Sequence, residues 1–224
     1  MVQAGAVRAV LRLLRGEQGP FRPKPALPIL DELVATVLSQ HTSDHNSERA
    51  FAALRERFPE WESVLAAPTA HVAGAIRSGG IADQKAPRIQ RILATVLDRE
   101  GHLGLERLRE LADSEVEAYL TSMPGVGPKT AACVLTFAMG RPAFPVDTHV
   151  HRIAARLGWV PATATAEQAH ALLRDAVPPG ARYDLHMALI AHGRTVCTAR
   201  RPACPGCVLR RRCAFGRASS LAER

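Results

Sequence analysis

Apolar residues recur at helical spacing through nearly the whole chain. The clearest stripe comprises Leu30, Leu33, Val34, Val37 and Leu38. Similar stripes occur within residues 89–97, 116–120 and 150–157, and this three-and-four spacing is typical of one face of an amphipathic helix. No segment shows a convincing alternation of polar and apolar residues, as a half-buried strand would. The sequence therefore predicts an all-α fold of roughly ten helices of ordinary length.

Glycine and proline divide these stripes into short helices. Asp147 is the predicted N-cap of a helix that Gly158 can end, because a carboxylate accepts the free amides of a first turn and glycine tolerates a left-handed backbone. Thr165 and Gln168 have the spacing of a capping box for the following helix. The proline-rich segment 21–28 is a predicted linker between an N-terminal helix and the main array.

Charge and composition narrow the class of partner. The chain carries 29 Lys and Arg against 21 Asp and Glu, a formal net charge of +8, which favours a polyanion such as nucleic acid. An aromatic content of 4% argues against binding single strands by rows of stacked rings. No run of about 18 apolar residues occurs, so a membrane-spanning helix is not expected. Arginines interrupt the N-terminal segment, which is typical of an amphipathic helix or an organelle transit sequence and not of a secretory signal.

Four of the five cysteines lie close together near the end of the chain. Cys197, Cys204, Cys207 and Cys213 have the spacing C-x6-C-x2-C-x5-C. Thiolates bind zinc and iron–sulfur clusters, and a structural zinc site more often pairs two C-x2-C knuckles across a longer spacer. One compact loop favours a [4Fe–4S] cluster over zinc. Because clustered thiols favour a reducing compartment, we expect a cytoplasmic protein. Cys133 stands apart and is expected to be a small core residue.

The cysteine loop is also strongly basic. It contains Arg200, Arg201, Arg210, Arg211 and Arg212. Such a run can be a solvated tail, but its density on a loop stiffened by a metal cluster favours contact with phosphate.

The stretch MPGVGPKTAACVL reads as a helix, a tight turn and a second helix. Gly125, Val126 and Gly127 form the turn, where glycines permit positive φ and expose amides that can bind an anion such as a DNA phosphate. Pro128 suits the first helical position. Lys129 follows it, at a helix start that disfavours a cation, so it can act as a neutral amine that forms a Schiff base. A lysine that only neutralises phosphate remains the alternative.

A nucleophilic amine needs a carboxylate to take its proton or to steady a developing cation. Asp147 lies 18 residues after Lys129 in the stretch VDTHVHR. From the residues alone, its role as a helix N-cap is the simpler interpretation.

Taken together, these stretches resemble the endonuclease III family of helix-hairpin-helix DNA glycosylases. The resemblance covers about residues 27–213 and includes the segments LSQHTSDHNSERA and GGIADQKAPRI. It implies two helical domains flanking a DNA-binding groove: residues 27–138, and residues 1–26 joined to 139–224. It also implies a monomer that acts on duplex DNA with damaged bases or abasic sites, is associated with the nucleoid if bacterial, and binds a [4Fe–4S] cluster through the four clustered cysteines.

The same resemblance implies roles for single residues. Asp147 would activate Lys129, which would attack C1′ of the damaged nucleotide, release the base and nick the strand by β-elimination. Gln40 or His41, together with Ile81, would fill the space left by the flipped base. His41 stands where glutamine is usual, and Ile81 where leucine is commoner. The expected activity is therefore glycosylase and abasic-site lyase, on oxidised pyrimidines.

Two other functions remain open. A monofunctional mismatch glycosylase would lack a lysine such as Lys129. A non-catalytic iron–sulfur protein that binds DNA or senses redox state would use the hairpin and the cluster, but would not need Lys129 and Asp147 together.

Overall fold

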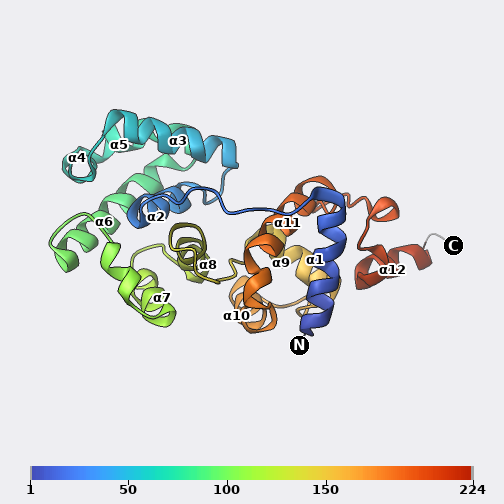
Figure 1. Ribbon diagram of the computed structural model, residues 1–224. Coiled ribbons are helices and arrows are strands. Elements are labelled where there is room, and N and C mark those ends of the chain that lie inside the picture. Colours follow the sequence, from blue (N-terminus) through green and yellow to red (C-terminus); the bar gives the residue numbers. More distant parts are fainter. Residues whose placement is uncertain (1, 223–224) are drawn as a thin grey trace. The chain divides into compact units, whose positions relative to one another are not determined.

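The computed structural model describes residues 2–222, which form helices and no strand (Figure 1). The α-helices are α1 (Ala4–Gln18), α2 (Ile29–Leu38), α3 (Asp44–Arg57), α4 (Trp61–Ala66), α5 (Thr69–Ala75), α6 (Ala82–Glu100), α7 (Asp113–Thr121), α8 (Pro128–Cys133), α9 (Thr148–Leu157), α10 (Ala166–Ala176), α11 (Arg182–Thr195) and α12 (Ala214–Ala222). The short helical segments are η1 (Arg77–Gly79), η2 (Glu106–Glu110), η3 (Val134–Ala138), η4 (Pro179–Ala181), η5 (Cys204–Gly206) and η6 (Arg210–Arg212). The all-α prediction is confirmed.

The chain divides into two compact units. The first, which we call the hairpin unit, is the continuous segment Pro25–Arg141. The second, the cysteine unit, combines Met1–Lys24 with Pro142–Arg224. The N-terminal helix α1 therefore belongs with the C-terminal helices, although the whole hairpin unit separates them in sequence.

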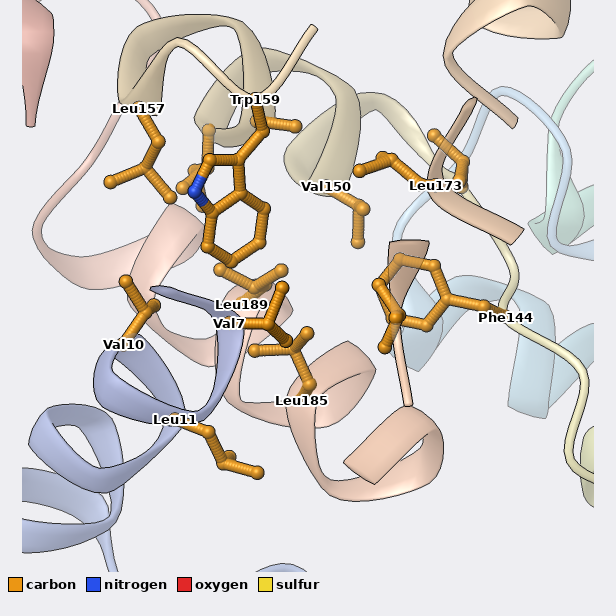
Figure 2. Packing of buried hydrophobic residues seen from close by; sticks show 14 of the residues in the cluster. Val7, Val10, Leu11, Phe144, Val150, Leu157, Trp159, Leu173, Leu185 and Leu189 are labelled. Carbon is orange, nitrogen blue, oxygen red and sulfur yellow. The ribbon is translucent and has the colours of Figure 1, made fainter. Parts of the chain in front are cut away.

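The core of the cysteine unit explains this pairing. Helix α1 buries Val7 and Leu14 completely because its apolar residues lie on one face. Figure 2 shows Val7 close to Leu185 and Leu189 of α11, in the same cluster as Val150 of α9. Because α9 is held in this core, Asp147 at its N-terminus has a defined position within the cysteine unit.

The predicted caps of the cysteine unit are present. The side chain of Asp147 accepts a hydrogen bond from the Val150 amide at the start of α9, and Gly158 ends that helix with φ of 79°. Thr165 and Gln168 form the reciprocal capping box of α10. These motifs were predictable because their partners lie within a few residues.

The hairpin unit is built around α2 and α6. Leu33 and Val34 of α2 and Ile89 and Ile92 of α6 are fully buried, so both helices follow the predicted stripes. Helix α2 packs against α8 and η3, which fixes the glycine turn that precedes α8.

The second helix of the predicted hairpin is less regular than its sequence indicates. Helix α8 ends at Cys133, and η3 continues it as a π-helix. Cys133 is 4% exposed, which confirms that it is a core residue. A π-helix holds one extra residue per turn and often lies near a functional site.

None of the helices in the described part of the chain combines the length and the apolar content that crossing a bilayer requires.

Candidate functional site

The glycine turn joins α7 to α8 as predicted. Gly125 has φ of 76°, in the region that favours glycine. Val126 is 5% exposed, and its amide donates to the Met123 carbonyl at 3.2 Å. Gly127 is the N-cap of α8 and Pro128 the first helical residue. The turn thus buries the Val126 side chain and leaves Gly125 exposed.

Arg88 closes the space beside this turn. A Cβ on Gly125 would lie 2.4 Å from the Arg88 Nε, so a side chain at position 125 would displace the guanidinium. Arg88 also donates to the Gln40 Oε1 at 2.9 Å. The Gln40 Nε2 in turn donates to the Gly125 carbonyl at 3.3 Å and to the Thr130 Oγ1 at 3.4 Å. Gln40 therefore braces the hairpin.

Lys129 is the second residue of α8 and is half-buried. The sequence contains two other lysines, Lys24 and Lys85. Lys85 is 0% exposed, and Lys24 is exposed in the segment between α1 and α2. Of the three lysines, Lys129 alone lies at the start of the helix that follows the glycine turn. This is the position at which the sequence predicts a nucleophilic amine.

Glu32 provides a carboxyl group near Lys129. It lies on α2, and its Oε1 accepts a hydrogen bond from the Thr36 Oγ1 at 3.1 Å. Burial raises the pKa of Glu32 from 4.5 to about 7, against the opposing effects of the Thr36 hydrogen bond and the Lys129 charge. Near neutral pH this carboxyl is therefore divided between its charged and neutral forms.

Glutamine in place of Glu32 is expected to flatten the pH dependence of stability. Because the pKa of Glu32 is higher in the folded state, its protonation stabilises the fold below pH 4.5, and that contribution is lost as the pH rises through about 7. The contribution is at most roughly 3 kcal/mol. Glu32→Gln should therefore raise the free energy of unfolding at pH 8 more than at pH 5, measured by urea titration. Exposed Glu48→Gln is the matched control. If Glu32→Gln changed the free energy of unfolding by the same amount at pH 5 and at pH 8, the raised pKa of Glu32 would be contradicted.

His41 and Ile81 occupy unusual backbone positions. Among the described residues they are the non-glycine residues with positive φ, at 54° and 41°. Ile81 is 43% exposed and His41 is also exposed. A β-branched residue in this region is rare, so the surrounding structure must impose the conformation on Ile81.

Asp147 is half-buried at the N-terminus of α9, in the cysteine unit. Its Oδ1 accepts from the Val150 amide at 2.7 Å. The simpler interpretation, an N-cap, is therefore correct as a structural role. A carboxylate has two oxygens, so capping through Oδ1 does not exclude a chemical role for Oδ2.

The four clustered cysteines line a single pocket. Cys197, Cys204, Cys207 and Cys213 surround it together with apolar residues such as Leu209. None of them forms a disulfide. Within residues 2–222, no three His, Cys, Asp or Glu side chains form a group that could hold a metal ion. The donor set of four thiols around one pocket nevertheless fits a metal cluster, because thiolates are the usual ligands of such clusters.

Local charges and donors also suit a cluster at this pocket. Burial raises the thiol pKa of Cys204 and of Cys207, and a bound metal would offset that cost by replacing the protons. The Gly216 amide donates to the Cys213 Sγ at 3.4 Å, and the Arg156 Nη1 to the Cys197 Sγ at 3.2 Å. Such N–H donors stabilise negative charge on sulfur.

Helix α9 connects this pocket to Asp147. Arg152 donates to the Cys197 carbonyl at 3.0 Å, and one turn later Arg156 donates to the Thr198 and Ala199 carbonyls at 2.7 and 2.9 Å. The start of the cysteine loop is therefore tied to the same helix that Asp147 caps.

Most of the arginines of the cysteine loop are open to solvent. Arg200 and Arg201, the two predicted DNA contacts, are both exposed, as are Arg211 and Arg212. Phosphate contact by these side chains is compatible with their exposure and remains a prediction.

Three residues of this region were not found from the sequence. Arg88, Glu32 and Lys85 lie in segments that read as ordinary polar helix faces. Gln40 lies 48 residues from Arg88, and Leu38 lies 47 residues from Lys85, and no local pattern encodes such pairs.

The chain matches known proteins in family, in sequence and in structure. The family model described as "HhH-GPD superfamily base excision DNA repair protein" matches residues 34–179. Endonuclease III of Thermotoga maritima is 35% identical over an alignment of 225 residues, which covers 100% of this chain and 97% of that protein. An Arabidopsis thaliana protein named as a candidate DNA glycosylase is 45% identical over 166 residues. That match covers 74% of this chain, and 57% of the plant protein's length.

Among solved structures, a trapped covalent intermediate of endonuclease III with DNA superposes with a TM-score of 0.84 at 28% identity. The match covers 98% of this chain and 100% of the other.

Proposed function

Because the chain belongs to the HhH-GPD superfamily of base excision DNA repair proteins, we propose that it is a DNA N-glycosylase with abasic-site lyase activity. Its proposed substrate is duplex DNA that carries oxidised pyrimidines or abasic sites. The observation that carries the proposal is Lys129, a lysine at the start of the helix that follows a glycine turn, in a chain with only two other lysines.

Lys129 is the proposed nucleophile. Its Nζ lone pair forms a bond to C1′ of the damaged nucleotide, and the glycosidic bond breaks so that the base leaves with that electron pair. Opening of the sugar ring yields an imine between Nζ and C1′. Loss of a proton from C2′ then drives cleavage of the C3′–O3′ bond, which nicks the strand on the 3′ side of the abasic site.

Asp147 is the proposed acid–base partner. Nζ must lose a proton before it attacks, and the sugar carbon gains positive charge as the base departs, so a carboxylate can serve both needs. The N-cap bond from Val150 fixes the χ angles of Asp147, so its second oxygen is held in one orientation. Fixed orientation lowers the reorganisation that the reaction requires.

The glycine turn and the two loop tips would bind the DNA. Backbone amides of Gly125 and Gly127 can bind a phosphate, which would hold the strand beside Lys129. Flipping the base costs a few kcal/mol, and side chains that fill the gap repay part of that cost. Since Gln40 braces the hairpin, His41 and Ile81 are the proposed gap-filling residues.

A [4Fe–4S] cluster is the proposed resident group of the cysteine pocket. Cys197, Cys204, Cys207 and Cys213 would hold it, and the cluster would supply four strong cross-links and a centre able to exchange an electron. In this chain those cross-links would stiffen the loop that Arg152 and Arg156 attach to α9.

Purified protein is expected to be yellow-brown and to contain about four irons per chain. Cys207→Ser should lose most of the iron, because one of four ligands is removed, whereas Cys133→Ser should retain it, since Cys133 is a core residue of α8. Metal analysis and visible absorbance measure both. A colourless, zinc-containing preparation would overturn the cluster in favour of zinc.

A lesion panel tests the proposed function. Duplexes with an oxidised pyrimidine, an abasic site or a mismatch should be incubated with the protein, and base release and strand cleavage scored separately. Both products are expected from the oxidised pyrimidine, and borohydride should trap the imine on abasic DNA. Base release without strand cleavage would indicate a monofunctional glycosylase. Neither product, with the cluster intact, would indicate a protein that only binds DNA.

We also propose a cytoplasmic location, since none of the five cysteines forms a disulfide, which suits a reducing compartment.

A further inference from the structure

Lys85 is a lysine with no exposed surface. It is 0% exposed, on the first turns of α6. Its Nζ donates to the Leu38 carbonyl at 2.6 Å and to the Gly79 carbonyl at 2.8 Å. Burying an ammonium group is unfavourable, and an apolar side chain of similar length would fill the same space at lower cost. The two hydrogen bonds are what distinguish lysine here.

The two acceptors lie at equivalent places in the chain. Leu38 is the last residue of α2, and Gly79 is the last residue of η1. The segment after Leu38 carries His41, and the segment after Gly79 carries Ile81. One ammonium group therefore binds the carbonyls that directly precede both segments, and each segment carries an exposed residue of positive φ.

The two segments are also neighbours. A Cβ on Gly80 would lie 4.0 Å from both the His41 carbonyl and the Thr42 Oγ1. In addition, the backbone amide of Lys85 donates to the Ile81 carbonyl at 3.1 Å. Lys85 thus holds Ile81 through its main chain and the base of the His41 segment through its side chain.

From this arrangement we infer that Lys85 is a positioning residue that joins the segments 39–43 and 80–81 into one rigid wedge, so that His41 and Ile81 enter damaged DNA together. The inference rests on the proposed function. Two independent loops would each lose conformational freedom on binding, whereas a preformed wedge has already been ordered by folding. Pre-organisation of this kind increases affinity for the distorted site and not for undamaged duplex.

A binding cycle on a non-reactive abasic analogue tests the inference. Fluorescence anisotropy would give the dissociation constant for a duplex with a tetrahydrofuran site and for the same duplex undamaged. Lys85→Met is expected to weaken binding of the tetrahydrofuran duplex roughly tenfold and to leave the undamaged duplex within about twofold. Exposed Lys24→Met, which loses the same charge, is the matched control and should change neither constant.

The energetic coupling between His41 and Ile81 in DNA binding provides a second measurement. A Lys85 that only stabilised the fold would not change this coupling. With Lys85 present, His41→Ala and Ile81→Ala should be non-additive by roughly tenfold in the dissociation constant, since either change breaks the wedge. In the Lys85→Met background the non-additivity should fall below about twofold. A folded Lys85→Met protein with unchanged coupling, or one that loses affinity equally for both duplexes, would overturn the inference.

If Lys85→Met does not fold, hydrogen exchange on the unaltered protein decides. Amides of 39–43 and of 80–81 should gain protection together as the tetrahydrofuran duplex is added. Protection of one segment without the other would refute the wedge. An unaltered protein that binds both duplexes equally would instead refute the proposed function, and this inference with it.

Discussion

Glutamine in place of Lys129 is expected to abolish borohydride trapping and to lower strand cleavage by roughly a thousandfold or more. Glutamine has a similar length but no nucleophilic amine, so the imine cannot form. DNA binding should fall only a few-fold, because the turn at Gly125 and Gly127 would still be present to bind phosphate. Trapping would be measured as a covalent protein–DNA band on abasic duplex, and binding by anisotropy on the tetrahydrofuran duplex.

The small number of lysines makes the control unusually clean. Lys24→Gln removes an exposed lysine that lies outside the glycine turn and should leave trapping unchanged. Lys85 is buried, and its Nζ is engaged by two carbonyls. Mass spectrometry of the reduced cross-link should therefore locate the DNA on the peptide that contains Lys129. Trapping that persists in Lys129→Gln would transfer the role of nucleophile to another amine of the chain.

Loss of the Asp147 carboxylate is expected to lower the rate of base release by roughly 10²- to 10⁴-fold. The difficulty is that Asp147 also caps α9, so a simple deletion confuses catalysis with folding. Asp147→Ser separates the two, because a serine oxygen can still accept from the Val150 amide but carries no charge. Asp147→Ala should lose the same activity and about 1 kcal/mol of stability in addition.

The comparison of these two variants decides the role of Asp147. Equal loss of activity with different melting temperatures would support the proposed acid–base function. Full activity in Asp147→Ser would contradict it and would leave the N-cap as the only role. Single-turnover base release and thermal unfolding, measured on the same preparations, provide the two readouts.

Local signals in the sequence were sufficient for much of the helical framework. The capping box of Thr165 and Gln168, the cap at Asp147 and the stop at Gly158 were all confirmed, because each motif is complete within a few residues. The face of α2 was equally predictable, since burial follows the helical period. The clustered cysteines were predicted to lie together, and they do line one pocket.

Features that depend on distant partners were not predictable. Nothing local distinguishes Lys85 from a surface lysine, because its acceptor Leu38 is 47 residues away. Gln40 could not be assigned a role until its contacts with Arg88 and the Gly125 carbonyl were known. The π-helix at η3 was missed for a similar reason, since a change in hydrogen-bond register within an apolar run depends on packing. The catalytic roles of Lys129 and Asp147 stay predictions that the variants above test.

The burial of Lys85 has a practical consequence for covalent labelling. An acylating reagent at moderate concentration can reach Lys24 and Lys129 but not the sealed Lys85 amine. Apart from an α-amino group, the protein then offers one reference amine and one whose reactivity reports on the proposed nucleophile. The extent to which bound DNA protects Lys129 from acylation, relative to Lys24, would give the fraction of protein molecules that bind DNA at Lys129. This measurement needs no catalytic turnover.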